Sequence, residues 1–361
     1  MDDPGLAGYS QVMRILITGA TGNMGTALLR RLAAEPDIEV SGVARRVPTV
    51  GAGAPYDGVR WHAADVGDPA VVEPLTGWLD GVDAVVHLAW QIQPSHDRTQ
   101  LRRTNVDGTR HVLEAVQRAG VPVLVHASSV GVYGPGPKDS LVDESHPTTG
   151  IPSSSYSRDK VATEQMLEAA TGPRIVRLRP GLIFQHDAGS GIARLFLGPL
   201  PPVSLLRFGR VPLLPDHPRL RVQAVHADDV AEAYLAAVRT DVQGAFNIAA
   251  DPILDPPLLA RHLHGRTVSV PRGVLRGLAG ATWKARLQPT DPGWLDLAMG
   301  VPLLDCTRAA TALGWTPKHD ALSALDELLN GMSHYAGTGS AALRSRSGQL
   351  TGLLPGHGNP S

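Results

Sequence analysis

Cysteine, aromatic residues and lysine are all scarce in this chain. One of its 361 residues, Cys306, is a cysteine, and 4% are aromatic. A single cysteine excludes an intrachain disulfide and a cysteine-based metal cluster, and it is compatible with a reducing compartment. The scarcity of lysine limits which residues can serve as a basic group, because the chain has only Lys138, Lys160, Lys284 and Lys318.

Long hydrophobic runs and a strong charge imbalance are also missing. No run of about 18 apolar residues occurs, so a membrane-spanning helix is not expected. The net charge of −1 gives no reason to expect a nucleic acid or an acidic membrane as partner. The acidic start, Met1-Asp2-Asp3-Pro4, does not resemble a signal peptide. We therefore expect a soluble, cytoplasmic protein with neither kind of partner.

What the chain does contain is an alternation of short β-branched runs with amphipathic segments, which is typical of a parallel sheet covered by helices. We expect strands at 14–18, 38–44, 59–62, 82–89, 122–128 and 174–179, and helices at 23–34, 70–79, 98–119 and 155–170. Helix 98–119 has the clearest apolar period, and Gly120 fits its end. The fold class is therefore α/β, a Rossmann-like doubly wound parallel sheet with a smaller, mainly helical C-terminal substrate lobe.

The composition changes after Pro180 and again near the C-terminus. Stretch 198–220 is rich in Pro and Arg, and the tail is rich in Gly, Ser and Pro, which is typical of disorder. We expect a disordered leader at 1–12, a dinucleotide-binding Rossmann domain at 13–180 with 222–250 returning to it, a substrate lobe at 181–221 and 251–335, and a disordered tail at 336–361.

A glycine-rich turn follows the first expected strand, with glycines at Gly19, Gly22 and Gly25. Glycines at this spacing allow a tight turn, close approach of the backbone to a pyrophosphate, and close packing of the next helix on its strand. The first N–H groups of that helix then point at the phosphates. The strand–turn–helix context predicts a dinucleotide site.

The end of the second expected strand bears on the choice between NAD and NADP. An NAD site needs a carboxylate there for the ribose 2′-hydroxyl, whereas this chain has Arg45 and Arg46. Because a guanidinium suits a 2′-phosphate, we expect NADP in preference to NAD; the alternative is two solvent-exposed arginines. Asp65, at the end of the third strand, is either an acceptor for the adenine amino group or a turn residue.

Tyr156 and Lys160 stand four residues apart in the expected helix 155–170. Positions four apart share one face of a helix. A lysine beside a tyrosine lowers the pKa of the phenol toward the working range of a proton donor or acceptor. Together with a dinucleotide site, the pair predicts hydride chemistry on a carbonyl or an alcohol.

These motifs resemble the extended branch of the short-chain dehydrogenase/reductase superfamily, which contains the NAD-dependent epimerase/dehydratase family. The similarity runs from about residue 13 to about residue 332 and includes segments 65–66, 86–89, 105–109, 128–134, 177–181 and 225–231. It implies that Ser129 hydrogen-bonds the reacting oxygen, that Tyr156 moves the proton, and that Lys160 lowers the pKa of Tyr156 and holds the nicotinamide ribose.

The glycine-rich turn, the strand ends and the resemblance together give the set of residues expected to bind the cofactor. Within it, the resemblance places Asn105 near the nicotinamide. The expected set is Gly19, Thr21, Gly22, Asn23, Met24, Gly25, Arg45, Arg46, Asp65, Val66, Leu88, Ala89, Asn105, Tyr156, Lys160, Pro180 and Ile183.

Two departures from the family pattern argue against a nucleotide-sugar substrate. The stretch after Pro180 is apolar where such enzymes carry an asparagine, and Arg221 lies one residue farther from His226 than their arginine does. Apolar residues such as Leu182 suit a smaller or more apolar substrate. The expected substrate contacts are Trp90, Ser129 and Phe184.

Other tempting residues are expected to be structural. His226 with Asp228 and Asp229 could form a metal trio, but capping of a helix by either aspartate, with packing of the histidine, is the preferred reading. No metal site is expected. His87 should be a strand-end histidine. The lobe core should contain Trp283, Trp294 and Trp315, with the lining of a pocket as the alternative for any of them.

The leading hypothesis is an NAD(P)-dependent oxidoreductase that interconverts a carbonyl and a secondary alcohol of a small substrate. One alternative is a nucleotide-sugar epimerase or dehydratase, in which the hydride is returned to the product. Another is a non-catalytic NADP-sensing regulatory protein, which the Tyr156–Lys160 pair disfavours. A homodimer through helices 98–119 and 155–170 is also considered. Neither the identity of the substrate nor the direction of the reaction is encoded in a motif.

Overall fold

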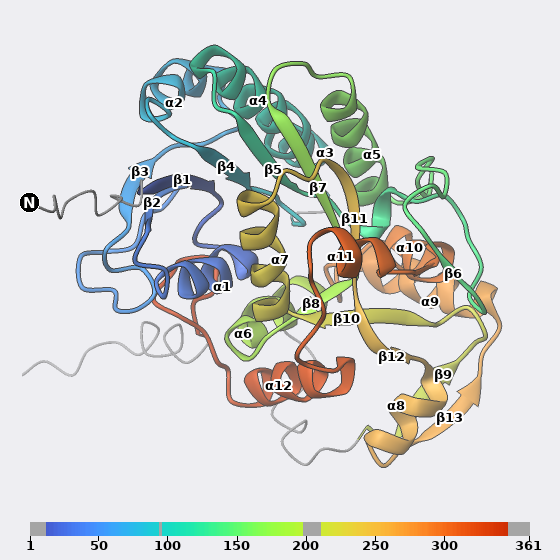
Figure 1. Cartoon of the computed structure of the whole chain (residues 1–361). Coiled ribbons are helices and arrows are strands. Elements are labelled where there is room, and N and C mark those ends of the chain that lie inside the picture. Colours follow the sequence, from blue (N-terminus) through green and yellow to red (C-terminus); the bar gives the residue numbers. More distant parts are fainter. Residues whose placement is uncertain (1–11, 94–95, 198–210, 346–361) are drawn as a thin grey trace, which may run out of the picture.

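A seven-stranded parallel sheet forms the centre of the structure, a computed structural model that describes residues 12–93, 96–197 and 211–345 (Figure 1). Its central strands are near-continuous apolar runs, as expected for strands buried on both faces. They confirm the strands expected from the sequence. In spatial order they are β11 (Gly244–Ile248), β7 (Arg174–Pro180), β5 (Val123–Ala127), β4 (Ala84–His87), β1 (Met13–Thr18), β2 (Ile38–Ala44) and β3 (Arg60–Ala63).

Helices cover both faces of this sheet. One face carries α1 (Asn23–Leu32), α7 (Ala227–Arg239) and α11 (Thr307–Ala312), and the other carries α2 (Val72–Trp78), α4 (Gly108–Ala119) and α5 (Ser155–Glu168). The strand order reverses between β1 and β4, so a crevice opens at their carboxyl ends, where open α/β sheets bind ligands.

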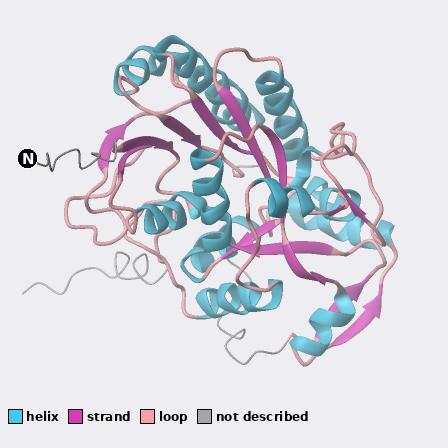
Figure 2. Cartoon of the chain, viewed as in Figure 1, coloured by secondary structure: helices cyan, strands magenta, loops and turns pink. Residues whose placement is uncertain are grey.

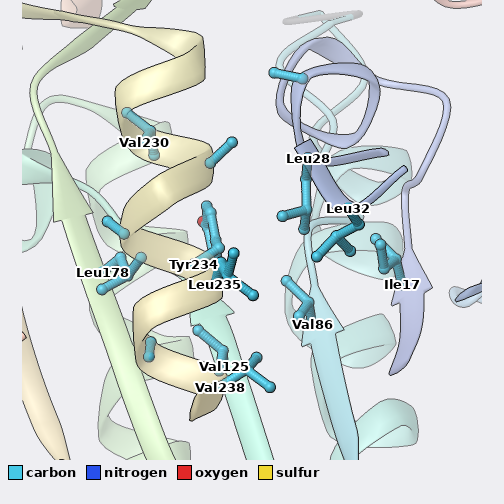
Figure 3. Close-up of a cluster of buried hydrophobic side chains, with 14 of the residues drawn as sticks. Ile17, Leu28, Leu32, Val86, Val125, Leu178, Val230, Tyr234, Leu235 and Val238 are labelled. Atoms are coloured by element: carbon cyan, nitrogen blue, oxygen red, sulfur yellow. The ribbon is translucent and has the colours of Figure 1, made fainter. Parts of the chain in front are cut away.

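The core between the sheet, α1 and α7 is built from interleaved aliphatic side chains (Figure 3). Both helices turn an apolar stripe toward the strands, and Tyr234 of α7 is fully buried among them. The labelled members are Ile17, Leu28, Leu32, Val86, Val125, Leu178, Val230, Tyr234, Leu235 and Val238.

The helix expected at 98–119 is present but irregular. It consists of α3 (Arg98–Arg102), a π-helical turn (Arg103–Asp107) and α4. Gly120 ends it with φ of 68°, a left-handed conformation that glycine adopts without strain. π-Turns within helices are frequent at functional sites, and this one carries Asn105.

The C-terminal lobe contains short strands as well as helices (Figure 2). Its three-stranded sheet places β10 (Val222–His226) between β8 (Leu182–Phe184) and β12 (Ala250–Leu254). Within segment 222–250, α7 packs on the main sheet and β11 pairs with β7, whereas β10 pairs with β8 and β12. The remaining strands form two separate pairs. In one, β9 (Leu213–Asp216) pairs with β13 (Arg266–Ser269), and in the other, β6 (Leu141–Val142) pairs with β14 (Leu303–Leu304).

The helices of the lobe are mostly short and separated by Pro and Gly. They are α6 (Gly189–Ile192), α8 (Pro256–His262), α9 (Arg272–Lys284), α10 (Pro292–Gly300) and α12 (Ala321–Ser333). Single helical turns occur in the lobe at His186–Ala188 and Ala193–Leu197, and outside it at Pro69–Val71 and Val130–Val132. None of the helices in the described ranges is both long enough and apolar enough to cross a bilayer. The expected leader, most of the loop-like stretch and residues 346–361 lie outside the described residues.

Candidate active site and cofactor crevice

Tyr156 and Lys160 lie one turn apart near the start of α5. Ser154 caps this helix, because its hydroxyl accepts a hydrogen bond from the N–H of Ser157 at 3.3 Å. The amine of Lys160 donates to the carbonyl oxygen of Ala127, the last residue of β5, at 2.6 Å. The pair therefore sits at the carboxyl end of the sheet, where the crevice opens.

The phenol of Tyr156 lies beside Ser129 and between two indole rings. The side chain of Ser129 acts on the hydroxyl and favours the ionised form of the phenol. The ring meets that of Trp90 edge-on with 5.9 Å between centroids, and the ring of Trp294 lies 4.9 Å away. A Cβ at Gly131 would come within 2.9 Å of the phenol ring. The missing side chain at Gly131 thus makes room for Tyr156 beside Ser129.

Lys160 is buried and packed beneath an aromatic face. Its Nζ lies 3.4 Å from the centroid of the Trp90 ring and 5.7 Å from that of Tyr156. Burial lowers the pKa of Lys160 to about 7, although the carboxylates of Glu164 and Asp159 act in the opposite direction. Both the charged and the neutral amine are therefore accessible near neutral pH.

The pKa of Tyr156 moves in the direction opposite to the one expected from the sequence. Burial raises it to about 12, and the interaction with Ser129 offsets only part of that rise. Lys160 makes no resolved contribution to the pKa of Tyr156; its Nζ lies 5.7 Å from the centroid of the phenol ring. In this form of the protein the phenol keeps its proton.

A buried ionic network anchors the same helix. Glu164, one turn beyond Lys160, receives hydrogen bonds from the guanidinium of Arg179 on β7 and from the hydroxyl of Ser128. Arg179 also donates to the hydroxyl of Tyr133 at 2.9 Å, which in turn donates to Asn247 at 2.6 Å. These contacts join α5 to β7 and β11, so they fix the register in which Tyr156 and Lys160 face the crevice.

The glycine-rich turn between β1 and α1 has no space for side chains. Gly19 has φ of +72°, and a Cβ there would lie 2.6 Å from the backbone nitrogen of Ala89. A Cβ at Gly25 would lie 2.4 Å from the carbonyl oxygen of Ala20. Gly22, which precedes α1, offers no side-chain acceptor to the first N–H groups of the helix. The N–H groups at the start of α1 therefore have no side-chain cap, which suits binding of the phosphates of a dinucleotide.

The crevice beside this turn contains many of the expected cofactor residues and also reaches Trp90, which packs on both Tyr156 and Lys160. Tyr156 and Lys160 are not among the lining residues themselves, and Trp90 connects the pair to the crevice. Its lining residues are Gly19, Thr21, Gly22, Val43, Ala44, Arg45, Ala64, Asp65, Val66, Leu88, Ala89, Trp90, Gln91, Thr104 and Ala342.

Arg45 lines the crevice, whereas Arg46 is exposed beside it and is not part of the lining. With its amide oxygen turned toward Arg45, Gln91 accepts hydrogen bonds from both terminal nitrogens of the guanidinium, one at 2.7 Å. Both residues line the crevice, so this contact spans it. The contact also holds the guanidinium at the end of β2.

Asp65 and Asn105 both organise backbone around the crevice. One carboxylate oxygen of Asp65 accepts from the N–H of Gly67 at 3.0 Å, and the other pairs with Arg103. Asp65 therefore shapes a turn and lines the crevice at once. The side chain of Asn105 accepts from the N–H of Gln91 at 2.8 Å and donates to its carbonyl at 2.9 Å, which fixes the loop that follows β4.

Residues 336–345 cross the glycine-rich turn, although the sequence suggested disorder from 336 onward. We call this segment the C-terminal strap. Ser340 is fully buried and donates to the carbonyl of Thr21 at 2.9 Å, and Leu343 is 5% exposed. Thr338 bonds the hydroxyl of Tyr56 at 2.7 Å, and Ala342 lines the crevice. The small side chains that suggested disorder allow this close packing.

Several expected site residues lie outside the crevice lining. Asn23 holds β8, because its amide donates to the carbonyl of Ile183 at 3.4 Å, and Met24 packs into the core. Pro180 is buried at the end of β7. Phe184 packs against α12 and β10 rather than near Tyr156, so its expected contact with substrate finds no support in this geometry.

The histidines singled out in the sequence are structural. His87 is buried between the hydroxyls of Thr18, at 2.6 Å, and Thr109, at 3.0 Å, and burial lowers its pKa to about 3. His226 itself caps α7, since its Nδ1 accepts from the N–H of Asp228 at 3.2 Å. The capping was expected from an aspartate instead. In the described part of the chain no three His, Cys, Asp or Glu residues are grouped to hold a metal.

Sequence reasoning missed the C-terminal strap, which covers the glycine-rich turn. Ser340 lies 319 residues beyond Thr21 along the chain, and the strap belongs to no motif.

The three tryptophans expected in the lobe core or in a pocket lining have different places. Trp294 packs against a lobe cluster that includes α10 and also lies against Tyr156. Trp315 is 4% exposed but packs in the core between the main sheet, α1 and α7 rather than in the lobe. Trp283 stacks on His96 with 4.3 Å between ring centroids.

Comparison with known proteins supports these assignments of fold. The profile of the NAD dependent epimerase/dehydratase family matches residues 15–249. Sterol demethylase protein B of Methylococcus capsulatus is 33% identical over 47% of this chain, and the yeast sterol-4-alpha-carboxylate 3-dehydrogenase of Saccharomyces cerevisiae is 28% identical over 48%. The chain spans 52% of the length of each, about half.

Other relatives match over more of the chain. A dTDP-glucose 4,6-dehydratase of Streptomyces griseus is 28% identical over 86% of this chain and 91% of its own length. Among solved structures, a UDP-glucose 4-epimerase of Thermotoga maritima with UDP-glucose has a TM-score of 0.67 at 21% identity, covering 90% of this chain and 98% of that one. At that identity the likeness establishes the fold alone.

Proposed function

Because this chain belongs to the NAD-dependent epimerase/dehydratase family, we propose that it is an NAD(P)-dependent oxidoreductase that interconverts a secondary alcohol and a carbonyl of a small, apolar substrate. The observation that carries this proposal is the position of Tyr156. Its phenol lies beside Ser129 and packs edge-on against Trp90, which lines the same crevice as the glycine-rich turn. Lys160 lies beneath that indole.

In this proposal Tyr156 carries the proton of the reaction. When bound, the nicotinamide cofactor supplies or accepts the hydride. In the reducing direction the phenol donates its proton to the substrate oxygen as negative charge develops there, and the hydroxyl of Ser129 donates a hydrogen bond to the same oxygen. In the oxidising direction the phenol first loses its own proton to solvent, and the phenolate then accepts the proton of the alcohol. A protonated Lys160 near the phenolate would favour that charged form.

The walls around Tyr156 favour an apolar substrate. Trp90 and Trp294 present aromatic surface on two sides of the phenol. Farther into the lobe, Arg219 donates to the carbonyls of Met299 and Gly136, and Arg221 donates to that of Lys138. Guanidinium groups engaged by the main chain in this way are not available to a pyrophosphate.

The nucleotide-sugar alternative keeps one specific support. The Streptomyces griseus relative, a dTDP-glucose dehydratase, matches over most of both chains. An epimerase or dehydratase returns its hydride to the product, so it would convert a nucleotide sugar with no net change in the cofactor. A redox enzyme changes the absorbance of the cofactor in proportion to product.

We further propose NADP as the preferred cofactor. The family is named for NAD, and solved relatives such as the UDP-glucose 4-epimerase of Thermus thermophilus contain NAD. The support for NADP is Arg45, which lines the crevice at the end of β2. The only carboxylate among the described lining residues is that of Asp65, which pairs with Arg103.

A homodimer through α3–α4 and α5 is retained as part of the proposal. Helices α4 and α5 contact each other on one face of the sheet, and Val161 and Ala162 of α5 are half-buried. The cytoplasmic location stays a prediction from the sequence.

The experiment that tests the function is a turnover assay of the full chain with NADPH and NADH over a panel of ketones, secondary alcohols and nucleotide sugars. Substitution Tyr156→Phe should lower kcat by at least about a hundredfold, because it removes the proton donor, while cofactor affinity stays within twofold, as read by thermal shift. Tyr335→Phe, outside the site, serves as the control. Full activity in Tyr156→Phe would overturn the proposal, and cofactor binding without any turnover would favour a sensor.

A further inference from the structure

Helix α9 stands out because none of its residues is buried. Val274 and Leu278, one turn apart, are 51% and 61% exposed, and Leu287, just beyond the helix, is 49% exposed. Large aliphatic side chains grouped on one exposed face of a helix commonly mark a site of interaction. A partner that covers this face would therefore gain apolar contact.

The charge around this helix is of one sign. Between Asp255 and Asp291 the chain carries six basic residues and no acidic one: Arg261, Arg266, Arg272, Arg276, Lys284 and Arg286. The carboxylate of Asp296 pairs with Arg272 and Arg276, but its side chain is only 3% exposed and lies on the inner side of α9. Lys284 and Arg286 are exposed and form no ion pair with any described residue. The outer side therefore remains positive.

The same helix borders the candidate active site. Trp283 of α9 stacks on His96 in the loop that follows β4. Helix α9 also packs on α10, whose Trp294 lies 4.9 Å from the phenol of Tyr156, measured between ring centroids. A surface that engages α9 therefore lies next to the walls of the substrate pocket.

We propose that this face docks on the surface of an anionic phospholipid bilayer. We define the α9 face as Val274, Leu278, Lys284, Arg286 and Leu287. Exposed aliphatic side chains together with lysine and arginine are what an interfacial helix uses, since the former enter the acyl boundary and the latter attract anionic headgroups. Docking would place the pocket beside the bilayer, which suits entry of an apolar substrate.

Two other occupants fit this face less well. A second copy of the chain, docked face to face, would bring like charges together. A nucleic acid would satisfy the cations but would leave Val274 and Leu278 without an apolar partner. The overall net charge of −1 suggested no acidic membrane partner, because a sum over the whole chain conceals this local excess.

Co-sedimentation of the full chain with vesicles tests the inference. Vesicles of phosphatidylcholine mixed with phosphatidylglycerol should bind at least tenfold more protein than phosphatidylcholine alone. Binding should fall as salt is raised from about 0.05 M to about 0.5 M, because the attraction to headgroups is screened. Equal binding to both vesicles, or none to either, would overturn the proposal.

Variants on the α9 face localise the effect. Val274→Ser with Leu278→Ser, and separately Lys284→Gln with Arg286→Gln, should each reduce binding at least fivefold. Leu141→Ser on β6, 51% exposed, and Arg110→Gln with Arg118→Gln on α4 are matched controls that should bind as the unmodified chain does. Circular dichroism confirms that each variant is folded.

Two further results would count against the bilayer. If the variants bind vesicles normally, the α9 face is not the contact. If they instead change the oligomeric state measured by light scattering, the occupant is a second copy. Vesicle binding is read without turnover, so its outcome is independent of the proposed enzymatic function.

Discussion

Burial shifts the pKa of Tyr156 and that of Lys160 toward the neutral form of each side chain, to about 12 and about 7. The sequence predicted the position of this pair but not its electrostatic state. Spacing of four residues reports only that two side chains share a face. The indole of Trp90 and the carbonyl of Ala127, which contact the buried amine of Lys160, come from the loop after β4 and from the end of β5.

The first prediction concerns the guanidinium groups at the end of β2. Arg45→Ala with Arg46→Ala should lower the NADPH/NADH affinity ratio by about ten- to a hundredfold, because a charge-assisted hydrogen bond contributes about 1.5–3 kcal/mol. Titration of intrinsic fluorescence with each cofactor measures the ratio. Arg118→Ala, exposed on α4, is the control. A ratio that stays the same in the double variant would refute a role in binding the 2′-phosphate.

The motif-bearing parts of the site could be predicted from the sequence, and the parts made by distant contacts could not. Gly19, Ser129 and Tyr156 follow strand ends at fixed spacing, so their positions follow from the fold. Trp294 and Ser340 belong to the lobe and the C-terminal strap, where no spacing rule applies. Phe184 was expected near the substrate because it follows Pro180, but β8 turns it toward α12.

At the scale of elements, the ionic network of α5 gives a prediction about stability. Glu164→Gln should lower the free energy of unfolding by about 3 kcal/mol, because it leaves the guanidinium of Arg179 buried without its carboxylate. Urea denaturation measures the change. Glu168→Gln is the control, since that side chain is 69% exposed and lies 3.8 Å from Arg177. Its effect should stay below about 0.5 kcal/mol. Equal effects would show that the network is not coupled to stability.

A second prediction at this scale concerns the C-terminal strap. A chain ending after Tyr335 should release NADPH several times faster, because it loses the bond from Ser340 to Thr21 and the cover from Ala342. Stopped-flow displacement of bound NADPH measures the rate. A chain ending after Ser345 keeps the strap and should behave as the full chain does. If both truncated chains release cofactor at the same rate, the strap has no part in retention.

Elements with a clear hydrophobic period were predicted well, and those without one were not. The strands of the main sheet and the helices between them follow their apolar patterns. Strands such as β6, with two residues, or β9, with four, are too short to show a period. Their pairing partners β14 and β13 are far along the chain, so only the folded lobe defines them.

For the molecule as a whole, buried amines make stability depend on pH. Burial lowers the pKa of Lys138 and that of Lys160 to about 7 each. Between about pH 7 and pH 10 the unfolded chain therefore binds more protons than the folded one, and stability rises with pH. Burial also raises the pKa of Tyr133 and that of Tyr156 to about 12, so above about pH 10 the folded chain binds more protons and stability falls.

Lys138→Gln tests this dependence. The slope of unfolding free energy against pH between about 7 and 10 should decrease by up to about 1.4 kcal/mol per pH unit. The reason is that the unfolded chain then binds one proton fewer in excess of the folded chain. Urea denaturation at several pH values measures the slope. Lys284→Gln, at an exposed lysine, should leave it unchanged. A slope in Lys138→Gln equal to that of the unmodified chain would mean that Lys138 titrates normally in the folded state.

The stacking of Trp90 on Lys160 has a consequence for the resting protein. With the amine stacked on the indole and bonded to Ala127, the pKa of Tyr156 is about 12, so at neutral pH the phenol can give up a proton but cannot act as a base. Under the proposed function, this form suits reduction of a carbonyl, whereas oxidation of an alcohol first requires loss of the phenolic proton.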